Sequence, residues 1–264
     1  MSLTGKTLAA SYKDILQVDN SNSGVTTSLK NVKDGEGTQS ALNISDDNVR
    51  IAPNNDDSTF ALQVRATAGA VVLAVDTTNE LVKASGNNVN TQYAHFAVAN
   101  KTASVFSANT HHAIPFAQGN FGGTAESAMP TFGTSTDPAT SLTTADADSD
   151  RASDIVPVMW YIPDAISIDS ITSIEGADAA TGDTTRMHLF SYDFTSGSTS
   201  ALTNGTLLGH NSDVTNAGSE QAYLSSWTVD SAAVAAGKVI LAFFRSDSIN
   251  SDYSISITVK YHLT

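Results

Sequence analysis

The sequence predicts an all-β protein, and three observations support this prediction. Only 15% of the 264 residues are charged, so the exposed faces of long helices would lack the Lys, Arg and Glu that helices favour. Short stretches of alternating apolar and polar residues recur, with the period of two that half-buried strands show. Clusters of Asp, Asn, Gly, Ser and Thr separate these stretches and are typical of the tight turns between strands.

The first part of the chain, residues 1–92, is predicted to be an extended region with short strands. Residues 1–40 are mostly polar, and their apolar segment Tyr12–Val18 fits either a strand or a helical turn. Four short alternating strands are expected after it, at 41–44, 48–51, 60–65 and 70–75.

These short strands predict a homotrimer. Each strand has two or three inward positions, so a sheet made by one chain would be too thin to be stable. Three copies wrapped around a common axis would bury their Leu, Ile, Val and Phe stripes against one another. Residues 1–92 are therefore expected to form an attachment segment and a trimeric, shaft-like assembly region.

The second part, residues 93–264, is predicted to be a β-sandwich. Seven or eight longer strands over ~170 residues fit a jelly roll. The strands are expected at 93–98, 154–162, 166–174, 187–194, 221–229, 239–245 and 253–263. The last of them alternates cleanly, with Tyr253, Ile255, Ile257, Val259 and Tyr261 on one face.

Two local signals add detail to this sandwich. Asn204-Gly205 lies between two short apolar stretches, which is a strong signal for a two-residue hairpin. Residues 230–237 begin with Asp and end with Gly, which predicts one capped helical turn.

A long loop, residues 119–153, leads to a calcium-site hypothesis. Carboxylates occupy positions one, three, five and nine of a calcium-loop pattern: Asp146, Asp148, Asp150 and Asp154. Position six is Arg151 where the sharp turn needs Gly, and position twelve is Pro157 where a bidentate Glu belongs. A calcium ion here would have irregular geometry, and the alternative is a solvated acidic loop without metal.

The sequence offers no enzyme motif, so we predict a non-enzymatic protein with no catalytic residue and no cofactor. Thr4–Thr7 resembles the end of a phosphate loop, but the upstream glycine has no place in the chain. No Gly-x-Ser-x-Gly or His-Glu-x-x-His pattern occurs. Adjacent His111 and His112 would point to opposite faces of a strand, so they do not predict a shared metal. Four carboxylates lie near one another in sequence without an aromatic sugar platform: Asp164, Asp169, Glu175 and Asp178.

The formal net charge of −14 argues against nucleic acid and anionic membranes as partners. Residues 1–92 contain seven basic and ten acidic side chains, whereas residues 93–264 contain six and 17. Binding to nucleic acid or to an anionic membrane surface depends on Lys and Arg, so neither partner is expected. No apolar run approaches the roughly 20 residues that cross a bilayer, so no membrane insertion is expected. Without cysteine, disulfides and thiolate metal sites are excluded.

Six segments spread over most of the chain carry a resemblance to known proteins. They are Leu3–Thr7, Gln17–Ser21, Tyr161–Ile168, Gly176–Thr184, Ala232–Val239 and Tyr253–Leu263. In these segments the chain resembles fibre-type virion proteins encoded by marine bacteriophages. The resemblance implies a trimeric fibre or spike, with an N-terminal segment that attaches to other virion proteins and a distal jelly roll. Its motifs are structural, so it transfers no active-site residue.

Three functional hypotheses follow from the sequence. The leading one is a virion fibre or spike, assembled in the host cytoplasm, whose distal sandwich contacts the host surface, with glycan as the candidate receptor. The second is a capsid decoration or head fibre that stabilises the shell or aids loose adhesion. The third is a jelly-roll lectin or a glycan-active enzyme. Jelly rolls serve all three roles, so fold alone does not choose among them.

Overall fold

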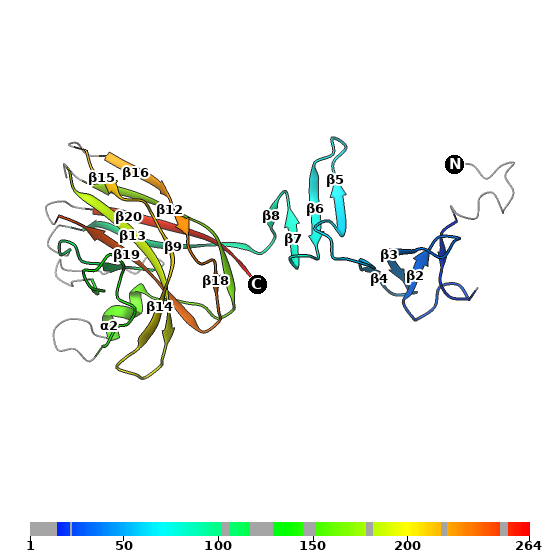
Figure 1. The fold of residues 1–264 in the computed structure, drawn as a ribbon, viewed down its shortest axis with the longest axis horizontal. Helices are drawn as coiled ribbons and strands as arrows, with labels where there is room; N and C mark the ends of the chain where they lie inside the picture. Colours follow the sequence, from blue (N-terminus) through cyan, green and yellow to red (C-terminus); the bar gives the residue numbers. More distant parts are fainter. Residues whose placement is uncertain are drawn as a thin grey trace. The chain divides into compact units, whose positions relative to one another are not determined.

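The computed structural model describes residues 15–21, 23–101, 106–116, 129–144, 152–177, 182–217, 221–248 and 253–264, without the side chains of 99–101. The all-β prediction is confirmed. Within the described ranges, the α-helical structure is a single turn, α2 (Ala152–Ile155), followed by a 3-10 turn, η3 (Val156–Val158). No helix in these ranges has the length and apolar character needed to cross a bilayer. The chain divides into two compact units, Met1–Val89 and Asn90–Thr264 (Figure 1).

The N-terminal unit contains two four-stranded antiparallel sheets, each built from strands in chain order. The first consists of β1 (Gln17–Val18), β2 (Lys30–Lys33), β3 (Gln39–Ile44) and β4 (Val49–Ile51). The second consists of β5 (Leu62–Arg65), β6 (Val71–Asp76), β7 (Leu81–Ala84) and β8 (Asn87–Asn88). The four short strands expected between residues 41 and 75 are present as β3 to β6.

The N-terminal unit leaves most of its large apolar side chains exposed. In its described residues, the buried hydrophobic side chains are those of Val32 and Ala74. Val49 is 71% exposed and Val64 is 50% exposed, although both lie in strands. Neither sheet therefore has a hydrophobic core of its own in the described chain.

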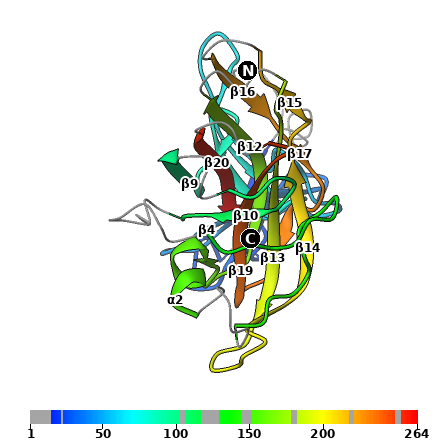
Figure 2. The same ribbon diagram turned by 90° about the vertical axis from the view of Figure 1, so that its left-hand side faces the viewer.

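The C-terminal unit contains two larger antiparallel sheets, which can be followed in Figures 1 and 2. The first, called the β12 sheet, has the order β16 (Gln221–Ser226), β12 (Ile166–Ala177), β20 (Tyr253–Leu263) and β9 (Thr91–Lys101), with β18 (Ala233–Val234) beside β12. The second, called the β13 sheet, has the order β10 (His112–Ile114), β19 (Lys238–Ser246), β13 (Thr184–Phe194), β14 (Leu202–His210) and β17 (Thr228–Val229). Two short strands flank it: β11 (Trp160–Tyr161) pairs with β19, and β15 (Val214–Thr215) pairs with β13.

The two sheets share one hydrophobic core. The predicted alternation of the last strand is confirmed, because Tyr253, Ile255, Ile257 and Val259 are all buried in this core. Alternate residues of β13 and β19 face it from the other side, among them Met187 and Phe244.

A second hydrophobic cluster covers the outer face of the β13 sheet. Phe132 and Ile155, from the segments before and within α2, join Phe190 and Phe243 of the sheet in this cluster. The described part of the predicted long loop, residues 129–144, is thus packed against the sheet. The β13 sheet is covered on both faces, which explains why β13 and β19 are buried almost continuously.

Four local predictions are wrong. Residues 221–229 do not form one strand, because β16 belongs to the β12 sheet and β17 to the β13 sheet. Residues 154–162 do not form one strand, since α2 and η3 precede the short β11; Pro157 lies in η3, and Ile155 and Val158 face the core three residues apart. Residues 230–237 form no helical turn, because Ala233–Val234 pairs with Ile166–Ser167 and buries Val234.

The Asn204-Gly205 hairpin is also absent, because both residues lie inside β14. Asn204 has a left-handed φ of 52° at a register irregularity opposite β13, and its amide donates to Asp193 over 2.7 Å. Left-handed asparagine thus serves a bulge within the strand here, rather than a turn between two strands.

Candidate functional site

The structure describes only one of the four sequence-predicted calcium ligands. Asp146, Asp148 and Asp150 lie outside the described residues, and Asp154 is half-buried in α2. Within the described ranges, no group of three or more His, Cys, Asp or Glu residues is arranged to hold a metal ion. The calcium hypothesis stays a prediction.

The predicted carboxylate group is dispersed. Glu175 is buried in the core between the sheets, whereas Asp169 is exposed on the opposite face of β12 and accepts a 2.8 Å hydrogen bond from His262 Nδ1. Asp164 is exposed in the turn before β12, and Asp178 lies outside the described residues. Glu175 and Asp169 therefore cannot act as the facing pair that glycoside hydrolysis needs.

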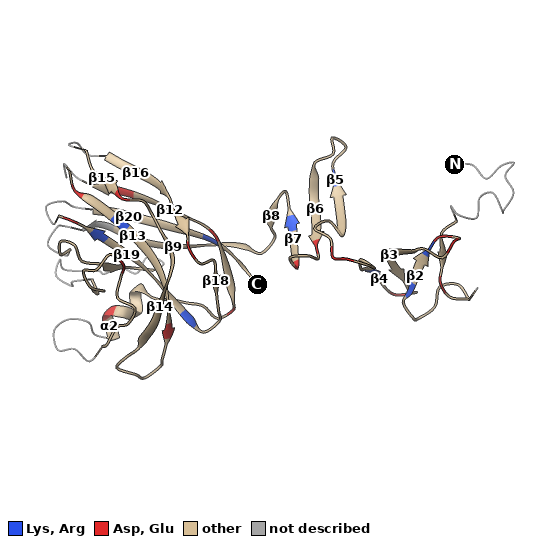
Figure 3. Ribbon diagram, viewed as in Figure 1, with Lys and Arg blue, Asp and Glu red and all other residues tan. Residues whose placement is uncertain are grey.

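The outer face of the β13 sheet carries four basic residues, called here the basic cluster: His111, Arg186, His188 and Arg245. Figure 3 shows basic positions on both β13 and β19. Arg186 and Arg245 are direct partners in the β13–β19 register. Their neighbours Met187 and Phe244 face the core, so the alternation of each strand turns both arginines outward. His188 lies two residues beyond Arg186 on the same face.

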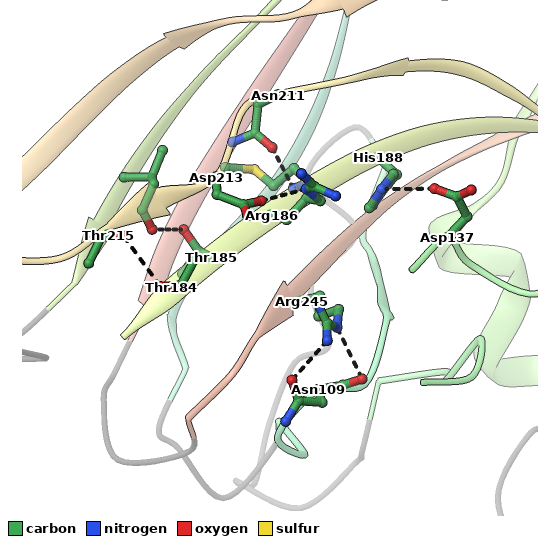
Figure 4. Close-up of polar contacts among 12 residues, drawn as sticks. Asn109, Asp137, Thr184, Thr185, Arg186, His188, Asn211, Asp213, Thr215 and Arg245 are labelled. Carbon is green, nitrogen blue, oxygen red and sulfur yellow. Dashed lines mark hydrogen bonds and ion pairs between the residues drawn. The ribbon is translucent and has the colours of Figure 1, made fainter. Parts of the chain in front are cut away.

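Each arginine of the basic cluster contacts a different kind of group (Figure 4). Arg186 forms a 2.5 Å ion pair with Asp213. Arg245 donates to the backbone carbonyl of Asn109 over 3.2 Å and to its side-chain oxygen over 2.8 Å. Asn109 has a left-handed φ of 56°, which asparagine tolerates better than most residues. Arg245 is thus held by neutral oxygens.

The two histidines of the basic cluster are buried side by side. Their ring centroids are 5.0 Å apart, and His188 Nε2 lies 3.4 Å from Asp137 Oδ1. Within the described chain, neither ring nitrogen of His111 has a hydrogen-bond partner, and neither has His188 Nδ1. Burial, with the nearby Arg245 and His112, lowers the pKa of His111 to about 4. Burial, with His111 and Arg186 nearby, lowers the pKa of His188 to about 3, so both rings are neutral at pH 7.

A separate pocket of about 350 Å³ lies between α2 and the β13–β14 connection. Its described lining includes Ile155, Met159 and Phe194 together with the hydroxyls of Thr195 and Ser198, and none of the described lining residues is charged.

No protein-family model and no curated protein matches this chain. In the basic cluster, two partly exposed guanidinium groups lie beside two buried, neutral imidazoles. The sequence did not predict this site. Its arginines are 59 positions apart in the numbering, and only the strand register brings them together.

Proposed function

We propose that this chain is a trimeric fibre or spike subunit of a bacteriophage particle. The N-terminal unit assembles three chains and attaches them to other virion proteins, and the C-terminal unit meets the host surface. The observation that carries the proposal is the apolar face that each thin N-terminal sheet leaves open.

The second N-terminal sheet illustrates this face. Its register pairs Leu62 with Val75, Val64 with Leu73, and Val75 with Val82, so all five side chains lie on one side. Leu62, Val64 and Val82 are 38%, 50% and 39% exposed. Burying such side chains is the main favourable term in association. A three-fold axis, which is a closed symmetry, would bring three such faces together without leaving an open end.

The C-terminal unit is proposed to be a jelly-roll β-sandwich. Its eight principal strands follow the chain as β9, β10, β12, β13, β14, β16, β19 and β20. When these strands are numbered one to eight in chain order, the order is 6-3-8-1 in the β12 sheet and 2-7-4-5 in the β13 sheet. The chain crosses between the sheets in the manner of two interleaved Greek keys, and this arrangement is used by viral capsid and lectin domains.

Light scattering on the full-length protein tests the trimer. We expect a mass of three chains for the natural sequence and of one chain for Val64→Asp, because the added charge would be buried at the axis. Gln63→Asp is the matched control, since it adds the same charge to the adjacent, opposite-facing position of β5 and should leave the trimer intact. A monomeric natural protein at micromolar concentration would contradict the proposal.

A further inference from the structure

The register of β13 and β19 places two positive charges directly opposite each other. Like charges at paired positions of adjacent strands destabilise a sheet unless something compensates them. The same two strands show the ordinary arrangement at their other end, where Lys238 pairs with Asp193 over a 2.8 Å ion pair. The Arg186–Arg245 pair is therefore an exception within its own sheet.

The compensation of this pair is incomplete in the described chain. Arg186 has the carboxylate of Asp213, which is itself 52% exposed. Arg245 is partly exposed and forms no ion pair with a described carboxylate; its partners are the neutral oxygens of Asn109. The second carboxylate at the cluster, Asp137, lies against the neutral ring of His188 at 3.4 Å, not against an arginine.

His111, next to Arg245, has polar atoms that are unpaired within the described residues. The β10–β19 register pairs His112 with Phe244, so His111 follows on opposite Arg245. His111 is 0% exposed, and neither of its ring nitrogens has a partner in the described chain. Buried polar atoms are almost always hydrogen-bonded, so the N–H of this ring needs a hydrogen-bond acceptor. A neutral imidazole carries one N–H donor for that purpose.

We propose that the basic cluster binds an oxyanion: the carboxylate or sulfate group of an acidic polysaccharide on the host surface. This inference rests on the proposed role of the C-terminal unit in host contact. Asn109 accepts from Nε and Nη2 of Arg245, so such a group would be held by the remaining guanidinium N–H groups of Arg245 and by the partly exposed Arg186. At about 0.15 M salt, charges more than about 8 Å away are largely screened, so the net charge of −14 does not prevent local binding.

Affinity electrophoresis of the full-length protein in gels that contain alginate, dextran sulfate or neutral dextran tests this site. We expect both acidic polymers, but not neutral dextran, to retard the natural protein. Arg245→Gln should weaken retardation about tenfold, because it removes a charge-assisted donor pair. Lys238→Gln is the matched control: it removes the same charge from the same strand at the opposite end and should bind normally.

Two further variants guard against a folding defect. Arg186→Gln removes the second fork from another strand and should also weaken binding. Asp213→Asn frees Arg186 from its carboxylate and should strengthen binding, which a purely structural role of the ion pair would not produce. Equal retardation of Arg245→Gln and Lys238→Gln, or unchanged binding by Asp213→Asn, would overturn the site.

A duplex DNA gel and an inorganic sulfate titration separate the sources of the anion. DNA retardation as strong as that by the polysaccharides would overturn the polysaccharide assignment. The assignment would also be overturned if inorganic sulfate stabilised the protein against unfolding more than chloride does at equal ionic strength, and did so only with Arg245 present, while no polysaccharide bound. Light scattering on the same samples reports assembly independently, so loss of the trimer and loss of the anion site can be told apart.

Discussion

Both carboxylate oxygens of Glu175 lie within hydrogen-bond distance of Thr185 Oγ1, at 2.7 and 2.8 Å, inside the core between the two sheets. A hydroxyl has one proton to donate, so it compensates only part of the charge of a buried carboxylate. Burial raises the pKa of Glu175 to about 7, although the hydrogen bond from Thr185 opposes this shift. The core of the C-terminal unit therefore contains an acid that ionises near neutral pH.

This position of Glu175 predicts a stability that falls as pH rises. The pKa is raised from 4.5 to about 7, so the folded state holds its proton more tightly than the unfolded state does. The resulting cost is absent below pH 4.5, grows through pH 7 and reaches up to about 3 kcal/mol above it. We expect Glu175→Gln to stabilise the unit at pH 8 and to have little effect at pH 4.5.

Urea unfolding followed by tryptophan fluorescence measures this difference, because both tryptophans, Trp160 and Trp227, lie in the C-terminal unit. Asp169→Asn, on the exposed face of the same strand, is the control and should not show the pH 8 gain. If Glu175→Gln destabilised the unit equally at both pH values, the contribution of Glu175 would not depend on its ionisation, which would contradict the raised pKa.

The two buried histidines predict the opposite pH dependence. The pKa of His111 is lowered to about 4 and that of His188 to about 3, so the unfolded state binds protons first as pH falls below 6.5. Each ring should cost about 2 kcal/mol of stability between pH 7 and pH 5. We expect His111→Gln to lose about 2 kcal/mol less than the natural protein over this interval, by the same fluorescence measurement. His95→Gln, at an exposed position of β9, should change nothing.

The sequence predicted strands with a regular apolar–polar alternation well, and it predicted features that depend on the pairing of distant strands poorly. Residues 253–263 alternate because one face of β20 meets the core and the other meets solvent, so apolar and polar residue types follow one another along the strand. β14 was missed because Asn204-Gly205 carries the residue types of a turn, while the structure uses them for a bulge beneath Tyr192. The local propensities of Asn and Gly do not predict the close approach of Gly205 to Tyr192, which depends on the tertiary structure.

The basic cluster illustrates a second limit. Arg186 and Arg245 each look like an ordinary polar residue at the end of an apolar strand. Their pairing depends on the β13–β19 register, and a shift of one residue would place them on opposite faces from each other. The sequence places His112 beside His111, whereas the ring that packs against His111 is that of His188, 77 positions later in the numbering.

Gly205 should resist any side chain. A Cβ at this position would lie 2.6 Å from Tyr192 Cε1 and 2.8 Å from Thr140 Cα, so β14 or the segment around Thr140 would have to move. We expect Gly205→Ala to destabilise the C-terminal unit by about 2 kcal/mol, as overpacking of a core does. Gly176→Ala is the control, since a Cβ there meets nothing within 4 Å. Equal unfolding free energies for the two variants would show that the contact with Thr140 is absent in solution.

The two units should differ in their ability to fold alone. The sequence suggested a division at residue 92, and the compact units divide between Val89 and Asn90. Asn90 donates to the carbonyl of Leu263, and Gln92 accepts from Tyr261 Oη, both over 2.8 Å, so a fragment of the second unit should begin at residue 90. With 175 residues around a shared core, that fragment is large enough to bury its own apolar surface.

We expect residues 90–264 to melt cooperatively as a monomer. Residues 1–89 should be disordered or aggregated as a single chain, because their apolar faces, including Val49 and Val64, are not covered by the described residues of this unit. Circular dichroism melting and light scattering of the two fragments measure both outcomes. A fragment 1–89 that folded as a stable monomer would show that these faces need no second copy, and the trimeric assembly would then have lost the observation on which it depends.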